Sequence, residues 1–101
     1  MASRIDLQNL LEDILGSKNV YFQPPESLRM VFPCIRYEYA DLDTKYADNK
    51  PYTHEIAYRI TYIDKNPDST TWLKIADLPK CKFGKPYKAD GMYHWVFSIY
   101  Y

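Results

Sequence analysis

The feature that most constrains the fold is a strict two-residue alternation of side chains over residues 54–64. Successive residues of a β-strand point to opposite faces of a sheet, so alternation assigns one set of side chains to each face. The larger apolar side chains share one face: Ile56, Tyr58, Ile60 and Tyr62. Ala57, Arg59, Thr61 and Ile63 occupy the other. This pattern predicts a strand with one face against a core.

Four further segments resemble strands. Residues 92–101 also alternate, and Asp90-Gly91 before them is a strong tight-turn signal. Residues 20–23 predict a short strand, and residues 28–39 a longer one with an edge or bulge near its proline. Residues 80–88 predict a weaker edge strand, because a glycine and a proline interrupt them.

Two segments predict helices. Ser3 and Asp6 resemble a capping box, and apolar residues then recur at helical spacing up to Gly16, a typical helix stop. A turn over residues 66–69 precedes a shorter helix, which Asp68 or Ser69 is expected to cap. A chain of 101 residues can build one core. We therefore expect a single α+β domain over residues 1–101, a mostly antiparallel sheet of four to five strands with two helices packed on one side.

Residues 41–53 contain Pro51 and turn-forming polar residues without an apolar period. This composition predicts a long loop between two strands. A loop of this length in a small domain is usually functional.

Few residues in the sequence suggest chemistry. His54 and His94 are the only histidines and form no metal-binding motif, and three glycines leave no phosphate-binding loop. The cluster of Asp41, Asp43, Asp48 and Asn49 lacks the spacing and glycine of a calcium loop, so we interpret it as solvated. Cys34 and Cys81 are interpreted as reduced core thiols, since the first 15 residues lack the pattern of a signal peptide. We expect no enzyme activity, metal or cofactor.

Charge is balanced overall but uneven along the chain. Thirteen basic and thirteen acidic residues cancel, which disfavours nucleic-acid binding as the main role. Residues 38–52 are rich in acidic groups and tyrosine, whereas residues 80–88 are rich in lysine. Unlike patches can join copies head to tail, although scattered solubilising charge accounts for the pattern as well. The candidate interface residues are Glu38, Asp41, Asp43, Tyr46, Asp48, Tyr52, Lys80, Lys82, Lys85 and Lys88.

Eleven tyrosines among 101 residues are an unusual number. Tyrosine combines a large ring with a polar tip, which suits surfaces that become buried against a partner. An aromatic-rich amphipathic sheet would also account for them.

Three segments resemble small neck proteins of long-tailed bacteriophages. They are Val20-Tyr-Phe-Gln-Pro-Pro-Glu-Ser, Tyr62-Ile-Asp-Lys-Asn-Pro-Asp-Ser and Leu78-Pro-Lys-Cys-Lys-Phe, together with the closing aromatic strand. The nearest type is the tail terminator, or tail-completion protein. The likeness covers most of the chain and agrees with the expected order of helices and strands.

The resemblance implies a structural virion protein in the tail neck, assembled in the host cytoplasm. It implies a homo-hexameric ring that caps the tail tube protein, stops tube growth and meets the head-tail connector or stopper protein. Phage DNA would pass through the ring without sequence-specific binding, and no membrane is involved.

Two other functions are compatible with the sequence. The first is a neighbouring head-tail connector or stopper of the neck. The second is a monomeric adaptor that binds an extended peptide along a sheet edge, either at residues 80–88 or early in residues 28–39.

Overall fold

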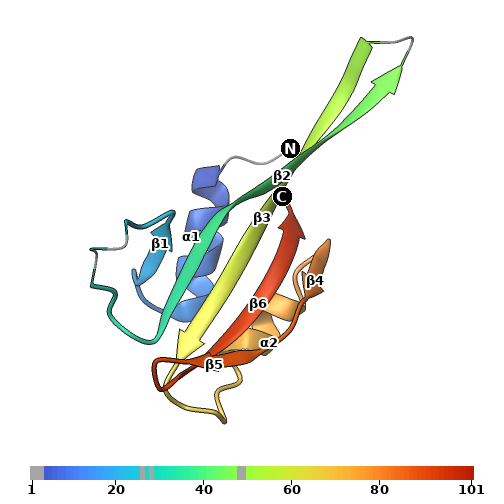
Figure 1. Cartoon of the computed structure of the whole chain (residues 1–101). Coiled ribbons are helices and arrows are strands. Elements are labelled where there is room, and N and C mark those ends of the chain that lie inside the picture. Colours follow the sequence, from blue (N-terminus) through green and yellow to red (C-terminus); the bar gives the residue numbers. More distant parts are fainter. Residues whose placement is uncertain (1–3, 26, 28, 48–49) are drawn as a thin grey trace.

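The computed structural model describes residues 4–25, 27, 29–47 and 50–101, and it has an α+β fold (Figure 1). The elements in chain order are α1 (Arg4–Leu15), β1 (Val20–Phe22), β2 (Cys34–Ala47), β3 (Lys50–Asp64), α2 (Thr71–Ala76), β4 (Cys81–Phe83), β5 (Tyr87–Ala89) and β6 (Met92–Tyr100).

The strands form one sheet in the order β1-β2-β3-β6-β4, and β5 pairs with β6 beside β4. Only β1 and β2 run parallel, so the sheet is mostly antiparallel as predicted. The predicted count of four to five strands was wrong, because residues 80–88 form two short strands. Gly84 N–H still donates to Val96 O at 2.7 Å, but Pro86 has no N–H to continue the ladder.

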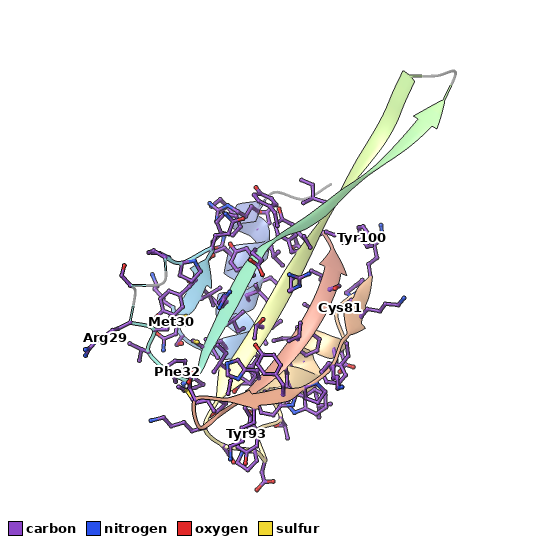
Figure 2. The ribbon with its side chains drawn as sticks, in the orientation of Figure 1. Arg29, Met30, Phe32, Cys81, Tyr93 and Tyr100 are labelled. Carbon is purple, nitrogen blue, oxygen red and sulfur yellow. The ribbon has the colours of Figure 1, made fainter. Side chains whose placement is uncertain are left out.

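The two helices cover one face of the sheet (Figures 1 and 2). Leu7 and Leu11 of α1 and Ile75 of α2 are fully buried there, within one apolar cluster. The predicted alternation is confirmed, since Tyr58 is buried and its neighbour Arg59 is exposed. The sequence pattern of β3 therefore fixes which sheet face receives the helices.

Several tyrosines are part of this core. The Tyr62 ring stacks on Trp95 with centroids 5.4 Å apart, an arrangement that contributes about 0.5–1.5 kcal/mol beyond its buried area. Its hydroxyl donates to Asp64 Oδ2 at 2.7 Å and lies 2.9 Å from Ser69 Oγ. Burial raises the pKa of the Tyr62 phenol. Part of the tyrosine surplus thus belongs to the core, where each ring is buried and its polar tip is paired.

The prediction of a loop over residues 41–53 was wrong. Strands β2 and β3 continue through this segment, with backbone pairing from Asp41↔Ala57 to Ala47↔Lys50. Backbone ladder hydrogen bonds, rather than an apolar face, hold this part together, so the sequence shows no hydrophobic period there. The result is a long hairpin that projects from the body, and the principal extents are 51 × 27 × 23 Å (Figure 1).

Other local predictions had mixed outcomes. Gly16 adopts φ +77° and ends α1, and Asp90 and Gly91 have positive φ in the turn before β6, as predicted. The long strand predicted from residue 28 begins only at Cys34. The N-cap position of α2 is Thr70, one residue after the predicted Ser69, although the Ser69 hydroxyl accepts a hydrogen bond from Thr71 N–H at 3.4 Å. The predicted cap residue Ser3 lies outside the described residues.

Candidate assembly surfaces

The projecting hairpin is the first candidate surface, and we call residues 40–47 of β2 and 50–56 of β3 the ribbon. The β1 ladder on β2 ends at Phe22↔Tyr37. On the other side, the β6 ladder on β3 ends at Ala57↔Tyr100, and Tyr101 N–H donates to Ile56 O at 3.1 Å. Within the described part of the chain, the ribbon strands therefore pair only with each other.

The length over which these two strands lack a further neighbouring strand is unusual. Its seven β2 positions after the bulge span about 23 Å at ~3.3 Å per residue. An isolated two-stranded hairpin is only marginally stable in water, and its two open edges present unpaired backbone groups. Such a segment is suited to pairing with another chain.

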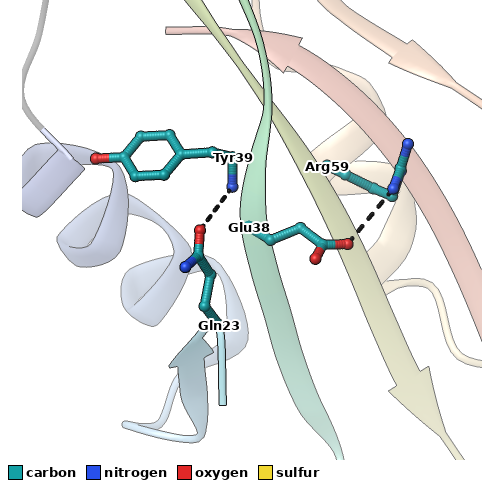
Figure 3. Close-up of polar contacts among 4 residues, drawn as sticks. All are labelled: Gln23, Glu38, Tyr39 and Arg59. Carbon is teal, nitrogen blue, oxygen red and sulfur yellow. Dashed lines mark hydrogen bonds and ion pairs between the residues drawn. The ribbon is translucent and has the colours of Figure 1, made fainter. Parts of the chain in front are cut away.

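A side-chain hydrogen bond from Gln23 and a β-bulge in β2 mark the base of the ribbon. The Gln23 side-chain oxygen accepts a hydrogen bond from Tyr39 N–H at 3.3 Å, one step beyond the last β1 pair (Figure 3). The register then shifts between Tyr39 and Asp41, which leaves Ala40 as an extra residue in β2. A bulge bends a strand and increases its twist, so Ala40 marks where the hairpin leaves the body.

Aromatic rings gather at this base. Tyr39 is 52% exposed and stacks on the buried Tyr58 with ring centroids 5.2 Å apart. Phe22 meets Tyr39 edge-on at 5.2 Å, and the Arg4 guanidinium lies 4.4 Å from the Phe22 ring centroid. The exposed side of Tyr39 is thus held in a fixed orientation beside the ribbon.

The second candidate surface is the lysine edge, which we define as residues 80–88. Its four lysines are all exposed, namely Lys80, Lys82, Lys85 and Lys88. The Lys88 ammonium lies 5.4 Å from the Tyr93 ring centroid. Within the same edge, the Phe83 ring is 41% exposed. The edge therefore combines positive charge with uncovered apolar surface, a combination found at protein interfaces.

The sheet face opposite the helices is more polar. Cross-strand pairing aligns Glu38, Arg59, Ser98 and Lys82 in one row. The Arg59 guanidinium lies 3.5 Å from the Glu38 carboxylate (Figure 3). An ion pair this exposed contributes only about 0–1 kcal/mol, so the row is interpreted as a solvated face.

The predicted interface residues fall into two groups in the structure. Lys80, Lys82, Lys85 and Lys88 lie together along one sheet edge, as a patch. Asp41, Asp43, Tyr46 and Tyr52 are ribbon strand positions, and Glu38 lies just below the ribbon on β2. Asp48 lies outside the described residues. The structure thus assigns the acidic and the basic candidates to different elements.

Cys34, Cys81 and His94 were also singled out by the sequence, and the structure describes all three side chains. Among the described residues, no group of three His, Cys, Asp or Glu side chains could hold a metal ion. Both thiols are free, and burial raises the pKa of the Cys34 thiol to about 12, although nearby Arg36 lowers it slightly. A thiol this rarely ionised is a poor nucleophile. His94 stacks on Tyr87 with centroids 4.6 Å apart, at a shallow pocket of about 340 Å³.

Sequence reasoning missed the hydrogen bond of Gln23 and the exposure of several apolar and aromatic side chains. Gln23 carried no signal, because its role depends on the side chain reaching another strand. Tyr39, Leu73 and Phe83 were predicted in strands or a helix, but only the tertiary structure shows them exposed.

In the part of the chain that the structure describes, no helix is long and apolar enough to cross a membrane.

No protein-family model and no curated protein is significantly similar to the chain.

Proposed function

We propose that the chain is a structural virion protein of a long-tailed bacteriophage, a tail terminator. In this proposal, copies form a ring, expected to be hexameric, at the head-proximal end of the tail. The ring ends growth of the tail tube and provides the surface on which the head connector or stopper protein docks. The proposal is motivated by the sequence resemblance and by the projecting ribbon.

The ribbon is the observation that carries the proposal. The ribbon extends beyond the part of the sheet that β1 and β6 flank, and a two-stranded hairpin without further strands is only marginally stable. A partner strand or surface would satisfy its open edges and stabilise it. A protein that joins two assemblies needs such an extension, since its body contacts one neighbour while the ribbon reaches another subunit or an adjoining ring.

A ribbon-shortened variant tests the proposal. Residues 45–53 are replaced by Asn-Gly, so that the paired Thr44 and His54 flank a two-residue turn. This variant should fold and keep a cooperative thermal unfolding transition, because residues 45–53 lie beyond the last pairs that β1 makes with β2 and that β6 makes with β3. Mixed with tail tube protein, the unaltered chain should give rings at tube ends and uniform tube lengths in electron micrographs, whereas the shortened chain should not.

Asp90→Asn is the matched control, because it alters a hairpin turn of the body and leaves the ribbon intact. It should cap tubes like the unaltered chain. If the shortened chain folds and still limits tube length, the ribbon is not the joining element and the proposal loses its main support.

The alternatives differ in their expected partners. A head-tail connector or stopper would bind the portal side of the neck and leave tube length unlimited. The peptide adaptor is favoured by the open edges of the ribbon, onto which an extended peptide could add as a strand. A 12.0 kDa species that stays monomeric at every concentration, even with tube protein present, would support the adaptor instead.

A further inference from the structure

We infer that the ribbon of one copy docks on the lysine edge of the next copy. The contact joins two different surfaces of identical chains, so it is heterologous and can close into a ring. The inference rests on the proposed function and deepens it by naming the surfaces through which the copies meet.

The lysine edge offers backbone groups as well as charge. Tyr100 N–H donates to Lys80 O, and Gly84 N–H donates to Val96 O, so these positions of the edge bond to β6. Alternate residues of an antiparallel strand bond to the same neighbour, and the backbone groups of Phe83 therefore point away from β6. Such an edge can accept hydrogen bonds from an added strand.

The two surfaces carry opposite charge. Residues 80–88 contain four lysines and no acidic residue, which gives a net charge of +4. The ribbon, residues 40–47 and 50–56, contains three acidic residues and two lysines, which gives a net charge of −1. Opposite charges on two partners steer their association and set its register. The lysine edge would repel a second copy of itself, which favours the unlike pairing over an edge-to-edge one.

The ribbon is placed to meet another copy rather than its own edge. Figure 1 shows it extending away from the body, beyond the end of the sheet where β4 lies. Phe83, 41% exposed on the helix side of the edge, gives the docked ribbon apolar surface to cover. Charge thus directs the contact, and burial of this ring stabilises it.

Charge reversal on each side tests the inference. The edge variant carries Lys82→Glu and Lys85→Glu, and the ribbon variant carries Asp41→Lys and Asp43→Lys. Self-association is measured by sedimentation over a range of protein concentrations at low and high salt, alone and with tube protein. Each variant alone should associate at least tenfold more weakly than the unaltered chain, and salt should weaken the unaltered contact.

Complementation gives the decisive readout. A mixture of the two variants should regain association, because the unaltered ribbon of the edge variant can dock on the unaltered edge of the ribbon variant. The control variant Lys18→Glu with Lys65→Glu makes the same change in net charge as the edge variant, at exposed positions elsewhere, and should associate normally. Association of the edge variant at the level of the unaltered chain, or failure of the mixture to recover, overturns the inference.

Two further outcomes separate the inference from the proposed function. If charge reversal abolishes and restores self-association but the unaltered chain never limits tube length, the contact stands and the tail function fails. If the chain caps tubes and both variants cap them equally well, the function stands and this contact is wrong. An unaltered chain that remains monomeric with and without tube protein also overturns the contact.

Discussion

The side-chain oxygen of Gln23 accepts a hydrogen bond from the backbone N–H of Tyr39, at 3.3 Å (Figure 3). Gln23 N–H donates in turn to Tyr37 O at 2.9 Å, so one residue bonds to two alternate residues, Tyr37 and Tyr39, on the edge of β2. Its side chain takes the place of the next strand residue where β1 ends. The edge is therefore closed up to Tyr39 and open beyond it, which separates the body from the ribbon.

Gln23→Ala should open this part of the edge. We expect faster hydrogen exchange at the Tyr39 amide and a loss of about 0.5–1.5 kcal/mol in the free energy of unfolding, the usual net contribution of one hydrogen bond. Amide exchange followed by NMR measures the first effect. Gln23→Glu keeps an accepting oxygen and should retain the protection of Tyr39. Equal exchange in all three proteins would show that this hydrogen bond does not close the edge.

Tyr37→Phe should destabilise the packing of α1 on the sheet. The Tyr37 hydroxyl donates to Gln8 Oε1 and accepts from Arg4 Nη1 at 3.1 Å, so its removal leaves two partly buried polar groups without their partner. The expected cost is about 1–3 kcal/mol, measured by urea unfolding. Tyr87→Phe is the control, since Tyr87 is 51% exposed and its change should stay within about 0.5 kcal/mol.

Alkaline pH should unfold the protein through its buried tyrosines. Burial raises the pKa of Tyr37, Tyr58 and Tyr62 above the ordinary value of 10.0. The unfolded chain then loses these protons at lower pH than the folded chain does. The stabilisation is complete below about pH 10 and declines as the pH rises toward the raised values. Urea unfolding across this pH range, with phenolate absorbance recorded in parallel, measures the effect. A free energy of unfolding that does not change with pH would contradict the prediction.

Gly91→Ala should weaken the turn between β5 and β6. Gly91 adopts φ +74°, a conformation that costs an alanine about 1 kcal/mol or more. Nothing lies within 4 Å of an added Cβ, so the loss comes from backbone strain alone. Gly91→Asn should cost less, because asparagine tolerates positive φ. Thermal unfolding of the two variants gives the comparison, and equal melting temperatures would argue against strain at this turn.

The predictions that succeeded rest on local patterns. The alternation around Tyr58, the helical spacing up to Gly16 and the turn at Asp90-Gly91 each follow from a few neighbouring residues. The four lysines of residues 80–88 lie along one sheet edge, because residues close together in the chain stay close in short neighbouring strands. Their part in an interface stays a prediction.

What the sequence determined by itself was the α+β class, the buried face of β3 in the body of the sheet and the separation of acidic from basic segments. Only the tertiary structure decided that residues 41–47 and 50–53 are strand rather than loop, because their pairing depends on register passed along β2 and β3 from the body. The tertiary structure also decided where the pairing of β1 with β2 ends, since the Gln23 side chain reaches Tyr39, 16 residues further along the chain. Contacts between distant residues leave no local period, and the ribbon and its base depend on such contacts.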